Sequence, residues 1–164
     1  MVTNVTRLLD SAEISYTLYQ LPAEKLGALE TARLLEVDPA IVFKTIVITR
    51  PGPHKPVLVL VAGTQEVDLR LLATALGDKK VYLPTEREAE SLTGLQAGGI
   101  SPLALINRGF QVVIDSSAKN HQQIHISAGR RGLNLKLGVD DLVTLTKARI
   151  AGVARPAAPM HMPG

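Results

Sequence analysis

The chain has 164 residues, of which 46% are hydrophobic and 20% are charged, a composition typical of a soluble globular protein. Its length favours one domain with a single core, and its net charge of +3 allows an anionic partner without requiring one. The absence of cysteine excludes disulfides, thiolate metal sites and a cysteine nucleophile. No apolar run approaches the roughly 20 residues of a membrane helix, and no secretory signal opens the chain, so we expect a cytoplasmic protein.

Local sequence signals predict helices and strands that alternate along the chain. In chain order they give a helix over 4–12, strands over 15–21, a helix over 27–37, strands over 41–50 and 56–62, a helix over 68–77, a strand over 79–83, a helix over 85–93, strands over 111–115, 122–127 and 133–137, and a helix over 139–149. Asn4 is the expected cap of the first helix. Asp68 and Gly77 bracket the third, and Thr85 with Glu88 forms a capping-box pattern for the fourth.

Two runs rich in β-branched residues, 41–50 and 56–62, flank a turn punctuated by proline and glycine. We therefore expect a hairpin at the centre of the sheet. The domain is expected to span residues 1–150. Residues 151–164 are rich in proline and alanine and poor in large apolar side chains, so we expect them to form a flexible tail.

Lys44 stands near the start of the first central strand, in a stretch whose two faces are both largely apolar. A strand covered on both faces is buried, so Lys44 would lie at the rim of the core, with its stem packed and its ammonium free to meet a ligand. The alternative is a lysine that reaches water from a strand end, and the pattern alone favours this alternative.

Residues 93–102, TGLQAGGISP, contain the paired glycines Gly98 and Gly99. Glycine adopts positive φ without strain and lets backbone N–H groups approach a carbonyl or phosphate, so the segment could form an oxyanion hole. An ordinary connecting loop is the alternative, and turn statistics favour it.

A third candidate is SAGRRG, residues 127–132, where Ser127, Arg130 and Arg131 suit a phosphate contact. A solvated basic turn explains this segment equally well. Two histidines, His121 and His125, fall in and beside a predicted strand rather than on one helix face, so no metal site is expected. The glycine-rich nucleotide motifs and the G-x-S-x-G hydrolase motif do not occur, and no cofactor is expected.

Taken in order, VFKT (42–45), TGLQAGGISPLA (93–104) and ISAGRRG (126–132) resemble the YbaK/EbsC family, free-standing relatives of the editing domain of bacterial prolyl-tRNA synthetases. The resemblance covers residues 4–147. It implies an α/β domain of mixed α+β type, with a curved, mixed, barrel-like β-sheet flanked by helices. It also implies an enzyme that hydrolyses mischarged aminoacyl-tRNA in trans and so protects translation fidelity.

The same resemblance assigns roles to the candidate residues. Lys44 would be associated with activity in the pocket for the aminoacylated 3′ end, Gly98 and Gly99 would hold the substrate carbonyl, and Ser127 would be a pocket serine. The residues expected to bind substrate or tRNA are Thr45, Ile100, Ser101, Pro102, Arg130 and Arg131.

The leading substrate that the family implies is Cys-tRNA(Pro), whose own thiol attacks the ester, a route that needs no enzyme cysteine. Leu21 stands where these deacylases commonly have tyrosine, and Ala104 where the Cys-specific group commonly has glycine. Removal of Ala or Ser therefore stays an alternative, as does a non-catalytic module that binds tRNA or a nucleotide. The expected partner is the aminoacylated 3′ end of tRNA, with prolyl-tRNA synthetase as an optional second partner and no membrane.

Overall fold

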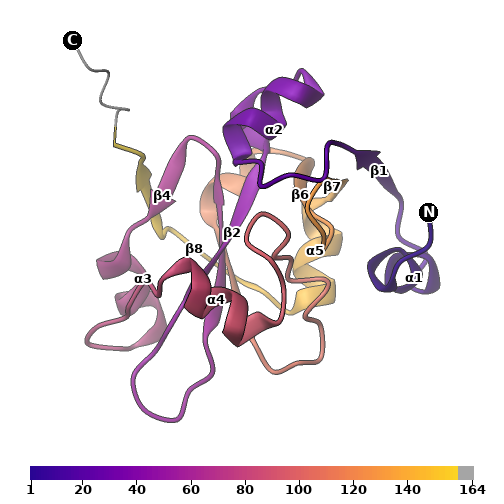
Figure 1. Ribbon diagram of the computed structural model, residues 1–164. Helices are drawn as coiled ribbons and strands as arrows, with labels where there is room; N and C mark the ends of the chain where they lie inside the picture. Colours follow the sequence, from indigo (N-terminus) through magenta and orange to yellow (C-terminus); the bar gives the residue numbers. More distant parts are fainter. Residues whose placement is uncertain (159–164) are drawn as a thin grey trace.

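A computed structural model describes residues 1–158 of the chain as a mixed α/β domain (Figure 1). Its elements are α1 (Asn4–Ser11), β1 (Tyr16–Gln20), α2 (Ala28–Leu35), the 3-10 helix η1 (Pro39–Ile41), β2 (Phe43–Ile48), β3 (Val57–Ala62), β4 (Gln65–Val67), α3 (Leu69–Leu76), α4 (Glu86–Thr93), β5 (Gln111–Asp115), the 3-10 helix η2 (Ser116–Asn120), β6 (Gln123–Ser127), β7 (Leu133–Gly138), α5 (Val139–Thr146), β8 (Arg149–Ala151) and β9 (Ala154–Pro156). None of the helices in this part of the chain is long and apolar enough to cross a membrane.

Helix ends follow local side-chain chemistry. The Asp68 carboxylate accepts two backbone N–H bonds at the start of α3, and Gly77 ends that helix in the left-handed conformation. Thr85 and Glu88 form the predicted capping box of α4. The cap of α1 is Thr3 rather than Asn4, because the Thr3 hydroxyl accepts the backbone N–H of Thr6. The predicted cap was therefore wrong by one residue.

The strands form three sheets. The largest has the order β2-β3-β5-β8, with β2 and β3 antiparallel and the other neighbours parallel, and a second sheet has the antiparallel order β1-β7-β6. The third is the pair β4-β9. The predicted hairpin at 41–62 is confirmed, since β2 pairs with β3 over its whole length.

The sheets do not close into a barrel, which corrects the barrel-like part of the expected fold. An isolated bridge from Val42, the residue before the edge strand β2, to His125 of β6 links the two sheets. Residues of both strands border a cavity. The side at which a barrel would close is therefore open.

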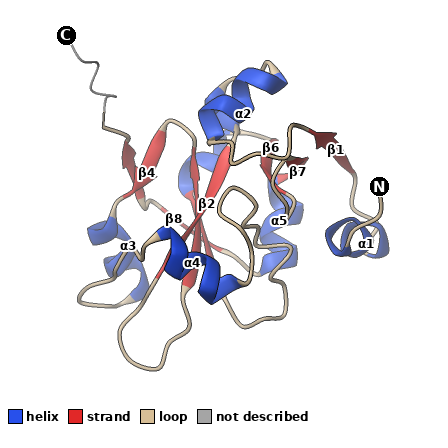
Figure 2. Cartoon of the chain, viewed as in Figure 1, coloured by secondary structure: helices blue, strands red, loops and turns tan. Residues whose placement is uncertain are grey.

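Two apolar clusters cover the two faces of the large sheet. One contains Phe43, Val47, Leu58 and Leu60 and continues into α1, β6, β7 and α5. The other contains Ile48, Val57, Val59 and Val61 and continues into α3. Every residue of β3 is buried, as the continuous apolar run of 57–62 predicts for a central strand. Figure 2 shows β2 passing between α2 and α4, so these two helices flank the exposed edge of the sheet.

The C-terminal segment differs from the expected tail. Strand β8 extends the large sheet, and β9 pairs with β4, so residues 151–156 contain ordered backbone. The buried Asp115 carboxylate holds the connection between these strands by accepting N–H bonds from Val153 and Ala154. Residues 159–164 of the expected tail lie outside the described part. The predicted strand at 79–83 is reduced to one bridge, between Thr49 and Tyr82.

Candidate active site

A cavity of about 490 Å³ lies along the open edge of β2. Strand β2 forms its floor, the 21–27 segment and α2 form one wall, and the start of α4 with the glycine segment forms another. The turn between β6 and β7 completes it. The cavity thus draws on segments from across the sequence and has a volume that suits a small ligand group.

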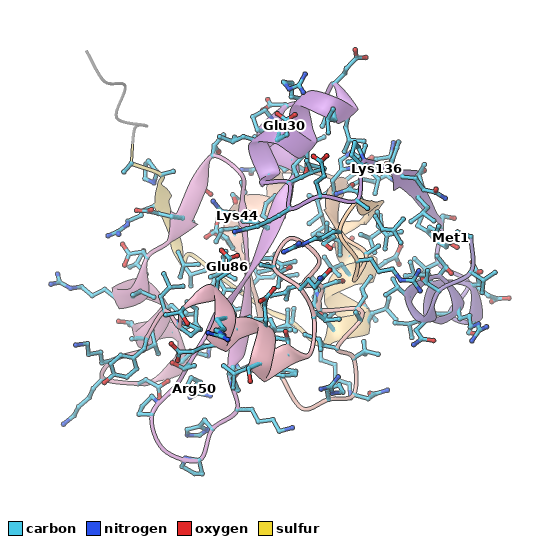
Figure 3. All side chains as sticks on the ribbon, viewed as in Figure 1. Met1, Glu30, Lys44, Arg50, Glu86 and Lys136 are labelled. Atoms are coloured by element: carbon cyan, nitrogen blue, oxygen red, sulfur yellow. The ribbon has the colours of Figure 1, made fainter. Side chains whose placement is uncertain are left out.

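Lys44 lines this cavity from β2 and is half-buried (Figure 3). Burial lowers the pKa of its ammonium below the usual value, and the charge of Glu66 opposes this shift only in part. Among residues 1–158, no carboxylate lies within ion-pair distance of Lys44. A partly desolvated cation without a bonded counter-charge favours an anionic ligand.

Thr45 follows Lys44 and also lines the cavity. Its hydroxyl oxygen is buried and makes no hydrogen bond with any described residue, the one side-chain polar atom of that part of the chain in this position. Buried polar groups normally have partners because an unsatisfied one costs about 1–3 kcal/mol. The Thr45 hydroxyl is therefore an unsatisfied polar group beside the cavity, although its oxygen has almost no accessible surface.

The paired glycines take different positions. Gly98 is exposed, has a φ of +88° and borders the cavity. Gly99 is buried, and its N–H donates to the Gln96 carbonyl at 2.8 Å. A Cβ on Gly99 would lie 2.9 Å from backbone atoms of Arg130 and Arg131, so only glycine fits there. Of the two amides, that of Gly98 has no protein acceptor within residues 1–158.

Ser127 and Asn134 line the cavity from β6 and β7. Asn134 is 5% exposed, and its Oδ1 lies 2.8 Å from Nδ1 of the buried His125. Burial lowers the pKa of His125, so a neutral ring donates its Nδ1–H to the Asn134 carbonyl. This contact fixes the orientation of the Asn134 side-chain amide. The ring centroids of Tyr19 and His125 lie 5.4 Å apart.

The other predicted binding residues divide into two groups. Ile100 lines the cavity, as does Thr45. Ser101 is fully buried, with its hydroxyl accepting the Leu103 N–H, and Pro102 is buried beside it, so neither borders the cavity. The two arginines of the β6–β7 turn do not border it either: Arg130 is exposed, and Arg131 donates its Nε–H to the Ala97 carbonyl at 2.7 Å.

Sequence reasoning missed several cavity residues, chiefly Lys25, Glu86 and Asn134. Lys25 and Glu86 form an ion pair across two walls of the cavity. No local motif marks these positions, because each becomes part of the site only through contacts between distant segments. Leu21, singled out by its departure from the family pattern, does line the cavity, whereas Ala104 does not.

An open α/β sheet with a half-buried lysine and a glycine segment around one cavity is an arrangement suited to a small anionic or carbonyl-bearing group. The aminoacyl-tRNA editing domain family model matches residues 24–145 of the chain. The chain therefore belongs to the aminoacyl-tRNA editing domain family. This confirms the sequence-based assignment to the YbaK/EbsC family and, with it, to the class of aminoacyl-tRNA deacylases.

Individual relatives agree with this assignment. The chain is 31% identical over 153 residues, 92% of each chain, to a protein of Enterococcus faecalis named Cys-tRNA(Pro)/Cys-tRNA(Cys) deacylase EbsC. It is 23% identical to the prolyl-tRNA editing protein ProX of Acetoanaerobium sticklandii over 85% of this chain and 87% of that protein. A crystal structure described as a trans-editing enzyme for prolyl tRNA synthetase superposes with a TM-score of 0.76 at 21% identity, over 94% of this chain and 99% of that chain. At 21% identity, the similarity to this solved structure shows a shared fold and nothing more.

Proposed function

We propose that the protein is a trans-editing deacylase that cleaves the ester of mischarged tRNA, with Cys-tRNA(Pro) as the leading substrate. The observation that carries the proposal is Lys44, a half-buried ammonium with no bonded carboxylate among residues 1–158, at an open cavity beside the unsatisfied hydroxyl of Thr45. The names of two relatives, deacylase EbsC and editing protein ProX, support the same reaction. We propose that the protein acts on charged tRNA in the cytoplasm.

The proposed chemistry needs little from the protein beyond position and charge. An aminoacyl ester is already activated, so a site that polarises its carbonyl and holds a nucleophile in place accelerates cleavage. The Lys44 ammonium stabilises negative charge near the ester or the 3′-terminal ribose, and the free N–H of Gly98 is a donor for the carbonyl oxygen. Water supplies the nucleophile for an alanyl or seryl ester, and the substrate thiol can supply it for a cysteinyl ester.

Cavity volume alone does not select the amino acid. Discrimination between side chains that differ by one small group amounts to roughly 10- to 200-fold. Ala-tRNA(Pro) and Ser-tRNA(Pro) are therefore alternative substrates within the same proposal. We further propose that prolyl-tRNA synthetase, which releases the mischarged product, is the partner next to which the protein acts.

The proposal is tested by deacylation of tRNA(Pro) charged separately with Cys, Ala, Ser and Pro. Wild type is expected to cleave a mischarged ester and to spare Pro-tRNA(Pro), and Lys44→Ala is expected to lose this activity. Lys119→Ala, a change at an exposed lysine of η2, is the matched control and should retain it. If wild type binds the tRNA but leaves every ester intact, the protein is a binding module and the proposal fails.

A further inference from the structure

The two arginines of the turn between β6 and β7 touch the glycine segment and do not border the cavity. The Arg131 side chain donates its Nε–H to the Ala97 carbonyl at 2.7 Å, and its Cγ lies 3.7 Å from the position of a Cβ on Gly98. Backbone atoms of Arg130 and Arg131 approach Gly99 so closely that no side chain fits between them. The turn and the glycine segment therefore form one packed unit.

Helix α4 holds the preceding peptide group, the one between Gln96 and Ala97. The Glu90 carboxylate accepts the backbone N–H of Ala97 at 2.8 Å. Both backbone polar groups of Ala97 are thus bonded to charged side chains, one from α4 and one from the β6–β7 turn. Hydrogen bonds to charged groups are roughly twice as strong as neutral ones, so the residue before Gly98 is firmly fixed.

This arrangement matters because Gly98 has few constraints of its own. It is exposed and lacks a Cβ, so its peptide groups would reorient readily without support from the neighbouring residues. A donor contributes to catalysis only when it is oriented before the reaction, and a displacement of about 1 Å can lower the rate by about 100-fold. Fixing Ala97 fixes the direction of the adjoining Gly98 N–H.

We propose that Arg131 is a positioning residue that, together with Glu90, orients the Gly98 amide for the substrate carbonyl. The inference rests on the proposed function and deepens it, and it replaces the expected role of Arg131 as a tRNA contact. Arg130, which is exposed in the same turn and makes no such bond within residues 1–158, remains available for phosphate.

The test compares Arg131→Gln with Arg130→Gln, two changes that remove the same charge from one turn. Deacylation is measured on full-length tRNA and on an acceptor-stem minihelix carrying the ester that wild type cleaves fastest. Arg131→Gln should lower kcat by about 10- to 100-fold on both substrates, with KM and the salt dependence of tRNA binding unchanged. Arg130→Gln should keep kcat and reduce the salt slope of tRNA binding by about one.

Two more variants separate positioning from general damage. Glu90→Ala removes the second hydrogen bond to Ala97 and should lower kcat by a similar factor. Arg131→Lys keeps the positive charge but loses the planar Nε donor, so its kcat should stay close to that of Arg131→Gln. Thermal unfolding controls for folding. A loss of tRNA affinity with unchanged kcat in Arg131→Gln would overturn the proposal in favour of a phosphate contact.

An independent readout does not depend on turnover. The backbone ¹H–¹⁵N resonance of Gly98 in the free protein should shift and broaden in Arg131→Gln and in Glu90→Ala but not in Arg130→Gln. An unchanged Gly98 resonance in both of the first two variants would overturn the positioning role. If wild type cleaves no ester, the proposed function fails, while this measurement still decides whether Arg131 and Glu90 fix the segment.

Discussion

Lys25 Nζ lies 2.5 Å from Glu86 Oε1, and this ion pair joins the 21–27 segment to the start of α4 across the cavity. The two side chains are 53% and 56% exposed. Exposed ion pairs contribute about 0–1 kcal/mol to stability, so we expect the pair to act mainly through the electrostatic field at the rim of the cavity.

Glu86→Gln and Lys25→Gln test this expectation, since both break the pair but shift the local charge in opposite directions. Removing the carboxylate should lower KM for charged tRNA by about 2- to 5-fold at low salt, and removing the ammonium should raise KM by a similar factor. Steady-state kinetics at two salt concentrations measures both effects. If KM changed in the same direction in both variants, the ion pair would act by holding the two walls of the cavity together and not through its charges.

Gly99→Ala should damage both folding and activity. The added Cβ would lie 2.9 Å from the backbone of Arg130 and Arg131, so the glycine segment must move away from the turn. Overpacking of this kind costs about 1–3 kcal/mol of unfolding free energy, and the displaced segment should lower kcat as well. Urea unfolding and deacylation rates measure the two losses.

Gly152→Ala is the control for that change. A Cβ at this position meets only the Ser116 hydroxyl oxygen, at an ordinary contact distance of 3.6 Å. The unfolding free energy should stay within about 0.5 kcal/mol of wild type. Equal destabilisation by the two variants would mean that the close approach at Gly99 does not constrain the segment.

His125 should make stability depend on pH below neutrality. Burial lowers its pKa, the hydrogen bond to Asn134 opposes this shift, and the charge of Lys136 adds to it. The unfolded chain, with a histidine pKa of about 6.5, therefore binds more protons than the folded one below that pH. Stability should fall as the pH drops from about 6.5 toward the lower folded pKa.

His125→Gln keeps a neutral donor for Asn134 and should flatten this part of the stability profile. His54→Gln, a change in the exposed turn before β3, should leave the profile as it is. Urea midpoints between pH 4 and 8, in roughly half-unit steps around the reference histidine pKa, give the comparison. A profile that stays equally steep in His125→Gln would assign the dependence to other groups.

Signals within a few residues predicted much of the fold. The caps at Asp68, Gly77, Thr85 and Glu88 and the apolar hairpin strands are local features, and the structure has them where they were expected. Strands β8 and β9 were missed because they are short and depend on distant backbone partners and on the Asp115 carboxylate. A sequence pattern cannot show such pairings.

The site was predicted only in part, because contacts between distant segments do not appear in local sequence patterns. The resemblance brought Lys44, Gly98 and Ser127 together, and these residues do line one cavity. It could not separate Arg130 from Arg131, since adjacent arginines look alike until one of them is seen to bond a distant carbonyl. Asn134 occupies a polar position of the alternating LNLKL pattern, which predicts exposure, yet it is buried and in contact with His125.

Lys44→Met should separate stability from activity. Burial lowers the pKa of Lys44, which means that the fold holds this ammonium less favourably than water does. The unfolded chain therefore binds more protons between the folded pKa and the usual lysine value of about 10.5, and wild-type stability should rise with pH across that window. A methionine of similar length removes the desolvated charge, so its melting temperature at pH 7 should equal or exceed that of wild type, and its profile should be flatter.

The deacylation activity of Lys44→Met should fall, although its stability should not. Losing the Lys44 cation from the floor of the cavity should lower deacylation by about 100-fold or more, because charge developing at the ester would no longer be stabilised. In wild type, activity should decline at alkaline pH, starting below the pH at which a free lysine loses its proton. Lys119→Met, at an exposed position, serves as the control for both measurements. A Lys44→Met protein that melts well below wild type would instead make Lys44 a structural residue, since only a fold that relied on its ammonium would be weakened by its loss.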